Sequence, residues 1–201
     1  MEKKFSKIFK LGAYLSISKL FFGALRIKVL AIILGVNGIG LLSLGMQFYV
    51  AATVVISLSL SVVLINLGRP FIVEENYVET GQIVGTITLI GICNALFFLI
   101  TIIILFQFGA FKNIENLNFF LFISIALASI FLAFSTILGE GLGFLIDRYD
   151  VYVRVNILAS IFDAIWISLG AWFYGLDGAL YGLLIASVTQ FIIYIIFLLK
   201  I

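Results

Sequence analysis

Long apolar runs dominate the chain, and short polar or charged clusters separate them. An α-helix needs roughly 20 apolar residues to cross a bilayer, and six runs of about that length occur. They cover residues 11–34, 39–65, 83–108, 119–145, 153–173 and 179–199. Runs such as LFFLITIIILF do not alternate between apolar and polar positions, as the strands of a membrane β-barrel would. The pattern predicts an all-α integral membrane protein, with residues 1–201 forming one bundle of six transmembrane helices.

Cations inside the first run are its least expected feature. Lys19 and Arg26 are seven residues apart and share one face of a helix, whereas Lys28 points away from it. A charge near the bilayer centre costs roughly 2.5–3.5 kcal/mol on insertion scales, which favours a polar interior over lipid. We interpret all three as candidate cavity residues. The alternatives are an interfacial position for the lysine ammonium groups, whose aliphatic stems can extend outward, and a structural role for Arg26, paired with Asp163 or a helix-end carbonyl.

A second polar face follows the fifth run. Asn156, Ser160 and Asp163 recur at spacings of four and three, with the acid near the middle of the run. Asp163 is therefore the natural counter-charge for the first run. It could keep the cations paired while a cavity is empty, or bind a coupling proton or sodium ion. Glu140, in the fourth run, is a second candidate for a coupling or counter-charge role, with a position at the cytoplasmic mouth as the alternative. We expect Asn156 and Ser160 to line the cavity, with Asn94 of the third run as a lesser polar position.

Composition decides the class of protein and excludes several functions. Hydrophobic residues make up 64% of the 201 and charged residues only 11%, which leaves too little polar surface to cover a soluble globule. A net charge of +2 gives no reason to expect a nucleic-acid partner. Histidine is absent and cysteine occurs once, so the commonest general base and metal ligand is missing. We expect no enzyme activity, no cofactor and no metal site.

The distribution of cations outside the runs or at their ends predicts the orientation in the membrane. Cytoplasmic loops carry an excess of lysine and arginine. Placing both termini in the cytoplasm puts eight cations inside and only Lys112 outside. The eight are Lys3, Lys4, Lys7, Lys10, Arg69, Arg148, Arg154 and Lys200. The basic N-terminus resembles a signal peptide, but cations interrupt the following run and no small-residue cleavage site follows, so we expect a retained first span.

Two connections have nearly the same sequence. Residues 35–38 read GVNG and residues 175–178 read GLDG, each between two apolar runs. Asx-Gly pairs are typical of tight turns. We expect both segments to be short turns at the outer face, formed by Asn37-Gly38 and Asp177-Gly178.

These same segments carry a resemblance to a known family. The stretch KVLAIILGVNGIGLLSLGMQF, with its exit LINLGRPFIVEE, resembles the first two spans of bacterial polysaccharide flippases. These are the O-antigen translocases of the multidrug/oligosaccharidyl-lipid/polysaccharide exporter superfamily. The stretch RYDVYVRVNILASIFDAIWISLGAWFYGLDGALYGLLIASVTQFIIYIIFLLK is similar to the fifth and sixth spans of that family.

The resemblance implies a transporter that moves undecaprenyl-pyrophosphate-linked oligosaccharides outward across the bacterial cytoplasmic membrane during surface polysaccharide and lipopolysaccharide synthesis. The family has two six-helix bundles around a cavity lined by cations, and this chain would correspond to the N-terminal half. Arg26, Lys19 and Lys28 are the positions that could supply such cations. We expect either a partial chain, or a second six-helix half or a homodimer, and no transport by this chain alone.

Other functions stay open at this point. An ion-coupled multidrug exporter of the same superfamily would favour acidic and aromatic residues in its site over Arg26, Lys19 and Lys28. A non-transporting half-length membrane subunit would also fit the length of the chain. A membrane-embedded enzyme of glycolipid metabolism is disfavoured, because histidine and clustered mid-membrane carboxylates are lacking.

Overall fold

Helices account for all the regular secondary structure in the described part of the chain. The computed structural model describes residues 2–108 and 119–198, so Lys112, Lys200 and the last residue of the sixth predicted run lie outside the described residues. The helices are α1 (Glu2–Ser57), α2 (Leu60–Val73), α3 (Tyr77–Gln107), α4 (Phe119–Ser135), the π-helix η1 (Thr136–Leu142), α5 (Gly143–Leu145) and α6 (Tyr149–Leu198). The prediction of an all-α protein is confirmed for these residues.

Four stretches of helix are long and apolar enough to cross a membrane. They are Phe9–Val73, Tyr77–Gln107, Phe119–Leu145 and Tyr149–Phe197. At 65 and 49 residues, the first and last are far longer than the roughly 20 residues that one crossing needs. Both contain a bend.

The bends lie at the two predicted turn segments, but at the first glycine of each and not at the Asx-Gly pair. In α1 the non-helical residue is Gly35, with φ 68° and ψ −177°. In α6 the break covers Tyr174 and Gly175, and Gly175 has φ 62° and ψ −139°. A positive φ is easily adopted only by glycine, so the first glycine of each segment makes the bend. The Asx-Gly pairs that we expected to form the turns lie within the helix that follows.

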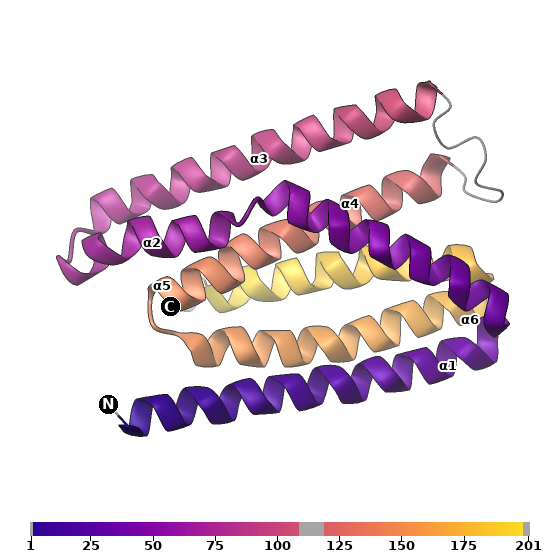
Figure 1. Ribbon diagram of the computed structural model, residues 1–201, viewed down its shortest axis with the longest axis horizontal. Helices are drawn as coiled ribbons and strands as arrows, with labels where there is room; N and C mark the ends of the chain where they lie inside the picture. The colour runs from indigo at the N-terminus through magenta and orange to yellow at the C-terminus, as the bar shows by residue number, and fades with distance from the viewer. Residues whose placement is uncertain (1, 109–118, 199–201) are drawn as a thin grey trace.

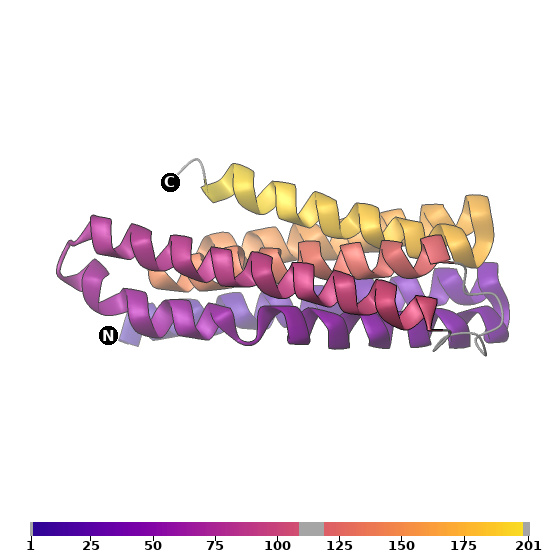
Figure 2. The same ribbon diagram turned by 90° about the horizontal axis from the view of Figure 1, so that it is seen from above.

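The bends fold α1 and α6 back on themselves, and each then has two arms. Figures 1 and 2 show the arms running lengthwise beside α4, with both bends at the end of the bundle opposite the start of α1. α6 packs against both α1 and α4. The largest buried cluster joins these three helices. It consists of Leu30, Leu42, Tyr49, Leu121, Ile125, Ala128, Ile167, Ala171, Ala179, Leu180 and Leu183.

Glycines bring the two arms of α6 into backbone contact beside the bend. A Cβ atom added to Gly170 would meet the carbonyl of Gly178, and one added to Gly178 would meet the carbonyl of Gly170. Small residues at such crossings let helix backbones approach closely. This contact places the arm that carries Asp163.

The second predicted run, residues 39–65, is interrupted in the structure. Leu58 and Ser59 have φ of 39° and 56°, and α2 starts after them. Asn94 of α3 donates its Nδ2–H at 3.4 Å to the carbonyl of Ile56, just before this break. In an apolar setting an unsatisfied carbonyl is costly, so Asn94 stabilises the break in the neighbouring helix.

We expect Asn94→Leu to lower the free energy of unfolding by about 1–3 kcal/mol, the usual cost of leaving a buried acceptor unsatisfied. The melting temperature of the purified protein in detergent measures this. Thr101→Val is the matched control on α3, because the Thr101 hydroxyl bonds only within its own helix, to the Phe97 carbonyl. Equal effects of the two changes would contradict the role of Asn94.

The fourth predicted run, residues 119–145, is helical but not uniform. It contains α4, the π-helical segment η1 and the short α5. In η1, a Cβ atom on Gly139 would meet the ring of Tyr194, and one on Gly141 would meet the side chain of Leu64 at 2.8 Å. The glycines of η1 therefore let this segment pack closely against α6 at Gly139 and against α2 at Gly141. The α2–α3 connection is also shorter than expected, because α2 continues to Val73 and α3 begins at Tyr77.

Candidate functional site

The structure brings four of the predicted site residues together. Lys19 and Arg26 of the first arm of α1 line a groove with Ser160 and Asp163 of the first arm of α6. We call this the Asp163 groove; it has a volume of about 210 Å³, and Phe22 and Gly23 complete its lining. The two polar faces read from the sequence therefore meet across one helix pair. The roles of these residues in binding or coupling stay predictions.

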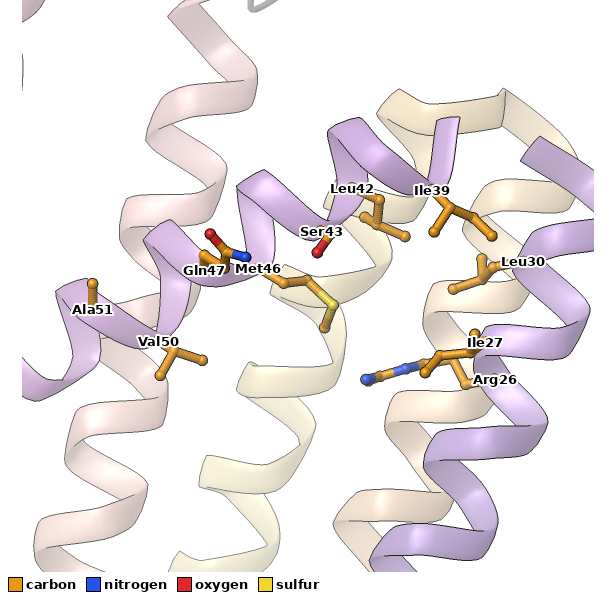
Figure 3. Close-up of a pocket in the computed structure, with 10 residues that line it drawn as sticks. All are labelled: Arg26, Ile27, Leu30, Ile39, Leu42, Ser43, Met46, Gln47, Val50 and Ala51. Carbon is orange, nitrogen blue, oxygen red and sulfur yellow. The ribbon is translucent and has the colours of Figure 1, made fainter. Parts of the chain in front are cut away.

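Arg26 also lines a second and larger groove, which lies between the two arms of α1. We call it the inter-arm groove, and its volume is about 530 Å³. Its lining residues are Arg26, Ile27, Leu30, Ile39, Leu42, Ser43, Met46, Gln47, Val50 and Ala51. Figure 3 shows the Arg26 guanidinium extending from the first arm into this space, toward the side chain of Met46. Arg26 thus lies where the two grooves adjoin.

The walls of the inter-arm groove are almost entirely apolar. Besides Arg26, only Ser43 and Gln47 bring polar side chains to it. These two were missed from the sequence, although their spacing of four places them on one helix face. The groove can therefore receive an apolar chain along its walls and an anion at its Arg26 end.

Arg26 lies beside an acid but forms no close contact with it in the described residues. Its Nε atom is buried and makes no hydrogen bond, and within the described residues no hydrogen bond or ion pair of Arg26 is found. Asp163 interacts electrostatically with both Arg26 and Lys19, and more strongly with Arg26. A buried N–H without a hydrogen bond is costly, so the Arg26 guanidinium is a candidate to bind an anion in the inter-arm groove.

The two lysines differ from Arg26 in their surroundings. Lys19 is exposed and lines the Asp163 groove. Lys28 is also exposed and lines neither groove. The structure therefore groups Lys19 with Arg26 in one groove. Lys28 lies outside both grooves, on the exposed surface of the arm.

Asn156 and Glu140 lie outside the lining of the Asp163 groove, although Glu140 interacts electrostatically with Lys19 of that groove. Asn156 is buried and donates to the Tyr194 hydroxyl and, at 3.0 Å, to the Tyr152 carbonyl. Glu140 lies in η1, half-buried, within electrostatic range of Tyr152 and Tyr194. Neither residue lines the two grooves at Arg26. Asn94 is also outside them, at the break between α1 and α2.

Metal ligands do not cluster in the part of the chain that the structure describes: no group of three or more His, Cys, Asp or Glu side chains is found there. Comparisons with known proteins give no match, whether to a family model, a curated protein or a solved structure. The chemistry of the two grooves is therefore the basis for a functional assignment.

Proposed function

We propose that this chain belongs to a flippase for undecaprenyl-pyrophosphate-linked oligosaccharides, which moves them across the bacterial cytoplasmic membrane for surface polysaccharide synthesis. One observation carries the proposal: a single guanidinium, which makes no hydrogen bond or ion pair within the described residues, lies at the edge of an apolar-walled groove. A polyprenyl pyrophosphate combines the two matching parts, an apolar chain and a strong anion. The role is transport, with no enzymatic step and no cofactor.

Each part of the ligand has a counterpart in the grooves. The planar guanidinium of Arg26 can bind two phosphate oxygens at once, and such charge-assisted bonds are the stronger ones. Ser43 and Gln47 supply further donors along the same groove. The aliphatic walls replace lipid around the first isoprene units, so the tail need not leave an apolar environment. The oligosaccharide extends beyond the groove.

We also propose how the helices cross the bilayer. Each arm of α1 and α6 crosses once, with α2 continuing the second arm of α1, and α3 and the α4–α5 segment cross once each. This gives six spans, with both termini cytoplasmic. Lys19 lines its groove and is exposed, and an exposed charge at membrane depth favours a covering surface. A second six-helix half or a second copy of this chain would provide it.

Asp163 favours one competing function, the export of organic cations by a multidrug-type exporter. An acid in a membrane groove is a typical counter-charge for such a ligand. However, two cations line the same groove, and they would repel a third positive charge. The anionic ligand is therefore the better match.

Ligand binding to the purified chain in lipid nanodiscs tests the assignment. Geranylgeranyl pyrophosphate should bind at least about tenfold more tightly than geranylgeraniol or inorganic pyrophosphate, which is roughly 1.4 kcal/mol for each missing part. Native mass spectrometry can measure all three. Tetraphenylphosphonium serves as the organic cation and should not compete. Tight binding of tetraphenylphosphonium without binding of the pyrophosphate would favour the exporter instead.

A further inference from the structure

Arg26 lines both grooves, whereas Asp163 lines only one of them. The flexible Arg26 side chain can therefore interact with an anion in either groove. One is the carboxylate of Asp163, fixed on α6. The other is a ligand in the inter-arm groove, toward which the guanidinium extends in Figure 3.

We propose that Asp163 is an internal competitor of the transported anion for Arg26. With the inter-arm groove empty, Asp163 attracts the guanidinium, and a bound pyrophosphate draws it away. This inference rests on the proposed function, because it concerns the affinity and release of the same ligand. A transporter must release its substrate. Arg26 is the one cation that lines the inter-arm groove among the described residues, and a carboxylate beside it lowers the affinity enough to allow release.

The surroundings of Asp163 allow this exchange. The charged or titratable groups that interact with it are Arg26, Lys19 and Tyr49. Tyr49 shares a hydrogen bond of 2.9 Å with the hydroxyl of Ser187 and is thereby engaged elsewhere. Lys19, exposed and on a long flexible stem, lines the same groove. Lys19 can therefore compensate Asp163 when Arg26 turns to the ligand.

A purely structural pair would look different. A buried ion pair contributes to stability only with close geometry and further hydrogen bonds. Here no hydrogen bond or ion pair of Arg26 is found among the described residues. The Ser160 hydroxyl, which could have supported the carboxylate, donates to the Asn156 carbonyl at 2.8 Å. The pair is thus held loosely, as a competitor has to be.

Asp163→Asn tests the inference, because it removes the charge and keeps the shape. In nanodiscs, the variant should bind geranylgeranyl pyrophosphate about fivefold more tightly than wild type, at the lower end of the typical coupling between two sites. The gain should appear mainly as slower dissociation. In an Arg26→Gln background the same change should leave affinity unaltered. Asp177→Asn is the matched control, since Asp177 is exposed on α6 and lines neither groove.

Three outcomes separate the possibilities. If Asp163→Asn binds as wild type while Arg26→Gln loses binding, the competitor role is wrong and the proposed function stands. If neither wild type nor Asp163→Asn binds the pyrophosphate, the proposed function itself fails. Asp163→Ser is a second neutral variant. If both neutral variants fail to accumulate while Asp163→Glu accumulates normally, the carboxylate is a structural requirement and the inference is overturned.

Discussion

Arg26→Ala is expected to weaken binding of geranylgeranyl pyrophosphate in nanodiscs by roughly 10- to 150-fold, because hydrogen bonds to charged groups contribute about 1.5–3 kcal/mol. The effect should be large since Arg26 is the only cation that lines the inter-arm groove among the described residues. Loss of this one group leaves the apolar walls intact, so affinity for geranylgeraniol should hardly change. Native mass spectrometry of the same samples measures both ligands.

Arg26→Lys should restore only part of the affinity. The ammonium keeps the charge, but it lacks the planar fork that binds two phosphate oxygens at once. Arg154→Ala is the matched control, because it also removes one guanidinium, from an exposed position on α6 outside both grooves. Equal binding by wild type and Arg26→Ala would end the assignment of this residue to the ligand.

A structural role for Arg26 predicts a different result from the same variants. If its main partner were Asp163, Arg26→Ala would leave a carboxylate unpaired in an apolar region, at a cost of about 3–5 kcal/mol. The amount of protein in the membrane would then fall, and the double change Arg26→Ala with Asp163→Ala would restore it. A ligand-binding role predicts normal amounts of all these variants. Measuring abundance and binding in parallel therefore separates the two roles.

The polar faces could be predicted from the sequence because they depend only on helical periodicity. Spacings of seven and three placed Lys19 with Arg26, and Ser160 with Asp163, on single faces. Charged faces on membrane helices are costly when they face lipid, so two such faces in an apolar chain tend to face each other. The structure accordingly places all four residues in one groove.

The rest of the site depends on features without a local signal. The shape of the inter-arm groove depends on the angle between the arms of α1. Tertiary packing determines that angle, and helical periodicity in the sequence does not predict it. The break at Leu58 and Ser59 contains neither glycine nor proline, so no breaker residue marks it. The assignment of the bends to the Asx-Gly pairs was wrong for a related reason. Turn statistics describe loops, whereas here the helix resumes directly after a single glycine with positive φ.

Gly170→Ala should disrupt folding, because it adds a methyl group where the backbones of the two arms of α6 meet. The new Cβ atom would overlap the carbonyl of Gly178 on the facing arm of α6, and a backbone atom cannot move aside as a side chain can. Overpacking typically costs about 1–3 kcal/mol and occasionally more, so the melting temperature in detergent should fall by roughly 5–10 °C.

Gly85→Ala is the control for Gly170→Ala, because a Cβ atom at Gly85 of α3 has no other atom within 4 Å. The control should be neutral or slightly stabilising, since alanine is the better helix former. The arm that contains Gly170 also carries Asp163, so separating the arms of α6 should shift the carboxylate relative to Arg26 and alter pyrophosphate affinity in the protein that still folds. Equal melting temperatures for Gly170→Ala and Gly85→Ala would mean that the two arms of α6 do not meet at these glycines.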